Sequence, residues 1–245
     1  MMKKINELVK YQMHIYFKGS KFVMPFVATA IYLFIMYSPM GWPVGVVTSC
    51  VITCNWVFLL MVWVGLSVSS AESPIMEQII FLRVKSNVCY YLSKMLFLII
   101  LGFIVNIICL LYPIVINLLS NGGAFERPLT FFDVINYLIV LCGSSMAGCS
   151  LGSFFHSRVM KDRKMAIVMT VLFATVTIAR IPIINALPLT KIITWILPPL
   201  DMVSRTYGSV GFFQVGNSFK VFFILFVYAI IAFIVKSLIC YKKKF

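Results

Sequence analysis

Thiols at helical spacing are the first residues in this chain that could do chemistry. Cys50 and Cys54 are four residues apart, and Cys142 and Cys149 are seven apart, so each pair falls on one face of a helix. A structural metal site would need further Cys or His ligands at such positions. Both histidines fall in basic segments at the edges of apolar stretches. We therefore expect no metal site and interpret the cysteines as small packing residues.

Motifs for nucleotide or hydrolytic chemistry are absent from the sequence. It contains no G-x-x-x-x-G-K-[ST] nucleotide-binding loop, no H-E-x-x-H zinc motif and no G-x-S-x-G nucleophile motif. All seven acidic residues are expected in loops or at surfaces, whereas ion-coupled carriers place ionisable groups at membrane depth. These residues are Glu7, Glu72, Glu77, Glu126, Asp133, Asp162 and Asp201. We expect no enzyme and no bound cofactor in this chain.

The elements that would position any site are apolar stretches. The chain of 245 residues is 62% hydrophobic and 11% charged, whereas soluble domains are roughly 25% charged. A membrane-spanning helix needs about 20 mostly apolar residues. We predict an all-α integral membrane protein in which 1–245 form a single transmembrane domain. The predicted spans are 22–38, 44–70, 95–119, 134–155, 166–186 and 219–239.

Lysine and arginine are distributed unevenly between the two ends of these spans. If the N-terminus is cytoplasmic, most of the 21 basic residues fall on the cytoplasmic side, as the positive-inside rule requires. The outer side keeps Arg127, Arg180, Lys191, Arg205 and Lys220. We therefore predict both termini in the cytoplasm. The net charge of +14 then reflects topology and contact with anionic membrane lipid rather than nucleic-acid binding.

Two further helices are expected on the cytoplasmic side. Polar and apolar residues in 1–21 recur at helical spacing, which favours an amphipathic helix in the headgroup layer over a disordered basic tail. In 72–87, Ser73 is a plausible N-cap and Pro74 the first helical residue, which predicts a short helix. This helix has one apolar side, and its polar residues include Glu72, Glu77, Gln78 and Arg83.

The fourth stretch has a face of small residues. Ser144, Gly148 and Gly152 recur every four residues, a pattern that lets helix backbones approach closely in lipid. The pattern predicts tight helix packing without identifying the helix on the other side.

Arg180 is the one charged residue inside a predicted span. Its side chain could extend to the outer headgroups, or it could line an outward-facing cavity or gate. Residues 187–210 are apolar but contain three prolines, and the apolar run around 192–197 that the prolines leave is too short to cross the membrane. They predict short re-entrant helices in the outer leaflet, where protein or water must satisfy the broken backbone.

This arrangement resembles the permease subunits of type 2 ABC exporters. The shared features are an interface helix, a cytoplasmic helix between spans two and three, broken outer helices between spans five and six, and six spans. The likeness covers the whole chain. It implies that 72–87 is the coupling helix that contacts an ABC ATPase subunit, with Glu72, Glu77, Gln78 and Arg83 as its polar contacts. It also implies that ATP and magnesium bind to that subunit. It also implies a second permease copy, identical or a sister chain.

The expected function is that of a permease subunit in an ATP-driven exporter of a bacterial plasma membrane. Small permeases of this kind export amphipathic peptides such as bacteriocins, and the 22 Phe, 14 Met and 11 Tyr residues would suit such a substrate. The alternatives are an exporter of polysaccharide, lipid or drug, a membrane-embedded enzyme, and a non-transporting immunity protein that binds a peptide toxin at the outer surface.

Overall fold

The computed structural model describes residues 2–71, 74–84, 86–155, 160, 162–208 and 210–242. Within these residues the chain is helical without strands, apart from one isolated β-bridge between Val44 and Phe125. The elements are α1 (Met2–Lys18), α2 (Val23–Met36), the 3-10 helix η1 (Pro39–Gly41), α3 (Val46–Ser69), α4 (Pro74–Val84), α5 (Asn87–Leu119), α6 (Phe131–Phe154), α7 (Arg163–Ile178), α8 (Arg180–Ala186), α9 (Thr190–Thr194), α10 (Asp201–Tyr207) and α11 (Val215–Lys242).

Four of the described helices, α3, α5, α6 and α11, are long and apolar enough to cross a membrane. Two bent pairs pass the same test when each is taken as one span: α1 with α2, bent by 74°, and α7 with α8, bent by 72°. The prediction of an all-helical, multi-pass membrane protein is therefore confirmed, with four to six spans.

Two of the predicted spans are not single helices long enough to cross a membrane. α2 has 14 residues, which gives a length of about 21 Å, less than the roughly 30 Å of a bilayer core. The predicted span 166–186 is broken at Ala179, where α7 ends and α8 turns away. α5 begins at Asn87, well before its predicted start at residue 95, because Ser86 caps it by accepting a hydrogen bond from the Cys89 N–H.

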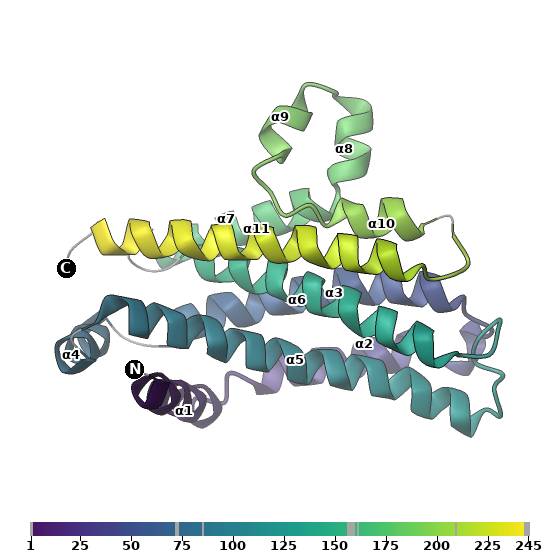
Figure 1. The fold of residues 1–245 in the computed structure, drawn as a ribbon, viewed down its shortest axis with the longest axis horizontal. Coiled ribbons are helices and arrows are strands. Elements are labelled where there is room, and N and C mark those ends of the chain that lie inside the picture. The colour runs from purple at the N-terminus through teal and green to yellow at the C-terminus, as the bar shows by residue number, and fades with distance from the viewer. Residues whose placement is uncertain are drawn as a thin grey trace.

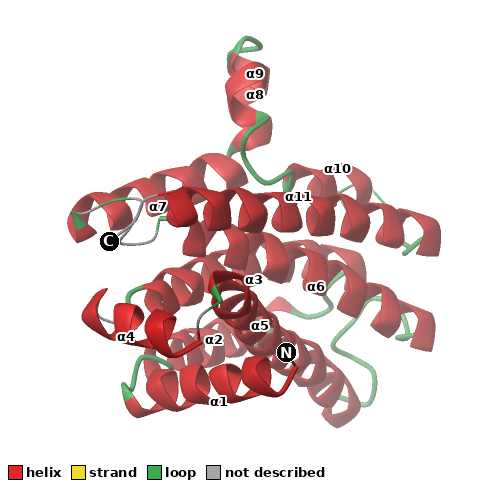
Figure 2. Cartoon of the chain, turned by 60° about the vertical axis from the view of Figure 1, so that its left-hand side comes forward, coloured by secondary structure: helices red, strands yellow, loops and turns green. Residues whose placement is uncertain are grey.

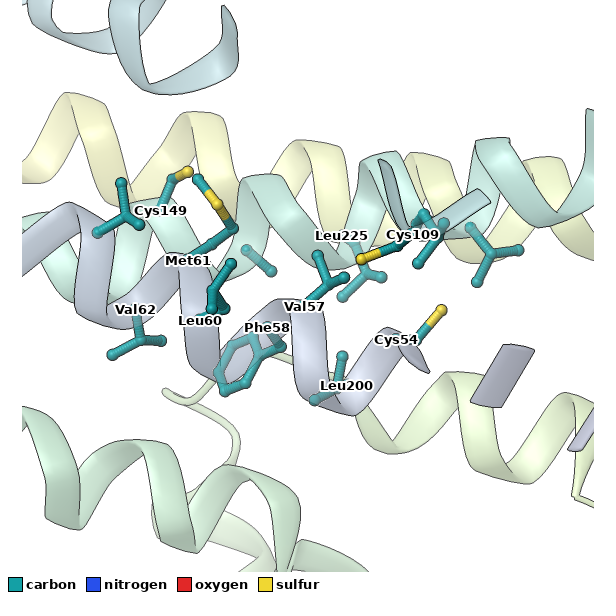
Figure 3. Packing of buried hydrophobic residues seen from close by; sticks show 14 of the residues in the cluster. Cys54, Val57, Phe58, Leu60, Met61, Val62, Cys109, Cys149, Leu200 and Leu225 are labelled. Atoms are coloured by element: carbon teal, nitrogen blue, oxygen red, sulfur yellow. The ribbon is translucent and has the colours of Figure 1, made fainter. Parts of the chain in front are cut away.

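The long helices run side by side, with both chain termini and α4 at one end of the bundle, which we call the terminal end (Figure 1). α3 packs against α6, and α6 also packs against α11 and α5. Val57, Phe58 and Met61 of α3 lie in the apolar core with Leu225 of α11 (Figure 3). Leu200, which precedes α10, lies against the same part of α3 (Figure 3).

α1 crosses the bundle instead of following it, and is seen almost end-on in Figure 1. It packs against α5, where the buried Gln12 side chain donates a hydrogen bond to the Ser93 hydroxyl at 3.3 Å. Its lysines Lys3, Lys4 and Lys10 are exposed. The helix is thus amphipathic, and its apolar side is buried against α5.

α8 and α9 stand off the bundle as a hairpin that projects sideways from the packed helices (Figure 1 and Figure 2). Residues 180–200, which we call the arm, include this hairpin and the segment that returns from it. Leu189, Ile192 and Trp195 near its tip are 85%, 77% and 80% exposed. The arm is therefore a protrusion whose apolar side chains Leu189, Ile192 and Trp195 are left uncovered by the described residues, whereas its root is buried.

Candidate functional site

α4 presents an apolar row at the terminal end of the bundle. Ile75, Ile79 and Leu82 are 69%, 53% and 77% exposed, and their spacing of four and three residues puts them on one face of the helix. Gln78 is exposed beside them. We call these four residues the α4 face. An exposed apolar row with a polar edge is characteristic of a surface that binds another protein.

A groove of about 390 Å³ separates α4 from α1. Glu7 and Lys4 of α1 and the exposed Arg83 of α4 place charges of both signs along it. Its apolar floor comes from Leu8, Met76 and Ile80, among others. The α4 face and this groove together form a candidate docking surface that contains two of the four predicted polar contacts, Gln78 and Arg83.

Glu77 points into the bundle and is only 2% exposed. It lies close enough to the buried Lys236 of α11 for their charges to interact, and Lys94 of α5 contributes to the same cluster. The Lys94 ammonium also lies over the Tyr90 ring, 4.6 Å from its centre. Glu77 is therefore turned away from the surface at which the resemblance implies a partner contact.

The helical period explains the position of Glu77. Residue 77 is two places from both 75 and 79, so it falls on the side of α4 opposite to the exposed row. Burial of a carboxylate is tolerated there because cations lie nearby. Glu72, the fourth predicted contact, lies outside the described residues.

Gly148 and Gly152 of α6 face the backbone of α3. A Cβ atom at Gly148 would lie 2.5 Å from the Phe58 carbonyl oxygen, and one at Gly152 would overlap the Val62 carbonyl. Gly65 of α3 makes the reciprocal approach, since its Cβ would lie 3.0 Å from the backbone of α6. We call this contact the α3–α6 seam. Only glycine allows the two backbones to come so close.

Ser144, the third small residue of the predicted face, is fully buried in the same helix. Sequence reasoning identified the α6 side of the seam but missed Gly65. A glycine inside an apolar stretch is the signal that could have indicated it, because glycine there lowers helix stability unless packing compensates.

Arg180 is buried at the root of the arm and pairs with Asp201, the first residue of α10. Arg180 Nη1 lies 2.9 Å from Asp201 Oδ1, and Arg205 Nε lies 3.0 Å from the other carboxylate oxygen. Because Arg180 begins the arm and Asp201 directly follows it, this ion pair closes the arm at its root. The Arg180 side chain is therefore held inside the chain by an acidic partner, a pairing that neither sequence interpretation included.

Asp201 is 8% exposed and Asp133 5% exposed, so the expectation that all acidic residues lie at surfaces or in loops is wrong for both, as for Glu77. Asp133 is the capping-box partner of Thr130 and pairs with both terminal nitrogens of Arg127 at 2.8 Å. A buried charge requires a partner of opposite sign. That rule could have linked Arg180 to Asp201, an acidic residue of the segment that follows Arg180.

The thiols contribute packing at the centre of the bundle. The sulfur atoms of Cys50 and Cys54 lie 3.9 Å apart on α3, and both side chains belong to the apolar core. Among the described residues, no group of three or more His, Cys, Asp and Glu side chains is placed to hold a metal ion.

The chain matches no family model, no curated protein and no solved structure. Its function is therefore inferred from its own residues and their geometry.

Proposed function

We propose that this chain is the membrane-spanning permease subunit of an ATP-driven exporter that resembles the type 2 ABC exporters and carries amphipathic peptides. The four long helices, with α2 and α7 as the crossing parts of the two bent pairs, would make six spans in a bacterial plasma membrane. Both termini, α1 and α4 would be cytoplasmic, as the distribution of Lys and Arg favours. A separate ATPase subunit would hydrolyse ATP, and a second permease copy would complete the pathway.

The α4 face is the observation that carries this proposal. It exposes an apolar row at the terminal end of the bundle, where both chain termini also lie. Apolar residues at positions i, i+4 and i+7 are the anchors with which a helix binds in a groove of another protein. An ATPase subunit with such a groove is the partner that a permease without a nucleotide-binding motif needs.

The buried cluster around Glu77 supplies a route for motion from α4 to the spans. Glu77 interacts electrostatically with Lys236 of α11, and Phe81 of α4 packs against Tyr90 of α5, with ring centres 4.6 Å apart. A displacement of α4 by the ATPase would therefore act on the terminal ends of α5 and α11. The tightly packed α3–α6 seam would transmit this motion as a rigid unit.

A second groove supports an amphipathic substrate. It has a volume of about 390 Å³ and lies between α2 and α5, with an almost wholly apolar lining that includes Phe22, Phe26, Phe34 and Tyr112. Aromatic side chains accept apolar surfaces of varied shape without specific polar partners. Such a groove suits the apolar side of an amphipathic peptide better than a polysaccharide.

The test is co-purification of the tagged full chain from its host in mild detergent, with mass spectrometry of the bound proteins. We expect the wild type to recover an ATPase that contains G-x-x-x-x-G-K-[ST], and Leu82→Glu to lose it because an acid replaces the end of the apolar row. Met40→Glu is the matched control, since Met40 is fully exposed in η1. Purification without an ATPase in every case would contradict the proposal and favour an immunity protein.

A further inference from the structure

The arm leaves the bundle partway along the long helices and not at either end of the bundle (Figure 1). α7 has 16 residues and rises about 24 Å before the bend. On the returning side, the Tyr228 hydroxyl donates a hydrogen bond to the Ile196 carbonyl at 3.0 Å. Tyr228 lies near the middle of the 28-residue α11. The returning segment of the arm therefore passes close to the centre of a membrane span.

Lipid is a poor cover for this arm. Residues 187–200 form turns, the five-residue helix α9 and a segment that contains two consecutive prolines. Irregular backbone at membrane depth is tolerated only where protein buries it or where it lines a water-filled cavity. The arm also exposes Lys191, a charge that is costly to place against lipid chains. The arm therefore needs a protein surface around it.

An apolar groove lined by aromatic side chains lies beside the root of the arm. This groove of about 250 Å³ lies between α6, α7, α11 and the returning segment of the same chain's arm, which contributes Ile196 and Leu197 to one wall. Its lining includes the aromatic side chains of Phe154, Phe155, Phe173 and Tyr228. Phe155 and Phe173 stack with ring centres 5.5 Å apart. Aromatic faces accept apolar side chains and also attract a lysine ammonium. The lining of the groove therefore suits both the apolar tip of the arm and Lys191.

We infer that the arm of one copy of this chain occupies the α7–α11 groove of a second copy. The arm and the α7–α11 groove lie next to each other on the surface of one copy. A twofold axis between two copies therefore brings each arm to the groove of the other copy. The exchange covers Leu189, Ile192 and Trp195 and places Lys191 beside aromatic rings. This inference rests on the proposed function only in taking a second permease copy as the partner.

Photo-crosslinking in membranes tests the exchange. p-Benzoylphenylalanine replaces Trp195 in one of two differently tagged copies of the full chain, expressed without an ATPase. We expect an adduct between the two copies that maps to the partner's α7 or α11. The matched control is the same replacement at Phe34, which is 72% exposed on α2 and should give no such adduct. An adduct with lipid alone, with another protein or with neither would overturn the inference.

A groove-filling variant provides a second readout. Ala232→Phe occupies the α7–α11 groove, whereas Ala30→Phe occupies the α2–α5 groove. We expect the first to abolish the Trp195 adduct and the second to retain it. Persistence of the adduct in Ala232→Phe would overturn the exchange. If Ala232→Phe does not accumulate in membranes, the comparison of the adducts at Trp195 and Phe34 tests the exchange by itself. Co-purification of an ATPase without a Trp195 adduct would overturn the exchange and leave the proposed function intact.

Discussion

The α3–α6 seam and the arm are both apolar, but the seam is buried between helices and the outer part of the arm is exposed. In the seam, Gly148 and Gly152 bring two uninterrupted helices into backbone contact, and the surrounding side chains are buried. In the arm, prolines interrupt the helices and the side chains near the tip are exposed. A continuous helix satisfies its own backbone polar groups, whereas a broken one depends on a neighbour. Apolar composition thus places a segment in the membrane without deciding what covers it.

The largest effect is expected at the root of the arm. Asp201→Asn removes the charge that two arginines contact and leaves Arg180 buried without a counter-charge, so we expect a loss of about 3–5 kcal/mol in stability. The measurement is the thermal transition of the purified chain in detergent. Arg205→Gln is the control, because its side chain is 54% exposed and such pairs contribute about 1 kcal/mol or less. Equal losses in the two variants would contradict a buried ion pair at the root.

The next largest effect is expected at the seam. Gly152→Ala places a Cβ against the Val62 carbonyl, and overpacking of this kind costs about 1–3 kcal/mol. We expect lower abundance in membranes and a lower unfolding temperature. Gly216→Ala is the matched control, since nothing lies within 4 Å of its added Cβ and alanine favours a helix. A Gly152→Ala protein as stable as Gly216→Ala would show that the seam is less tight than described.

The smallest effect is expected at the end of α6 away from the seam. Thr130→Ala removes the capping box with Asp133, which costs about 1 kcal/mol. Hydrogen exchange should therefore become faster in the first turn of α6 and stay unchanged near Gly148. Thr175→Ala is the control, because its exposed hydroxyl donates a hydrogen bond to the Leu172 carbonyl within its own helix. Faster exchange throughout α6 would mean that the seam depends on the cap.

The sequence predicted some parts of the docking surface better than others. The helix at 74–84 and its apolar side follow from Pro74 and from the spacing of Ile75, Ile79 and Leu82. The inward position of Glu77 does not follow from these local patterns. Its nearby cation Lys236 is more than 150 residues away along the chain and belongs to a different helix. Local patterns define the faces of a helix, but they do not identify which face another helix will bury.

The sequence by itself determined that this protein is helical and embedded in a membrane, because only continuous helices satisfy the backbone of long apolar stretches in lipid. It also determined that α6 has a face of small residues. Only the tertiary structure decided that this face meets α3, that Arg180 pairs with Asp201 across 21 positions, and that the arm stands clear of the bundle. These outcomes depend on contacts between distant segments, and such contacts form only when the helices pack.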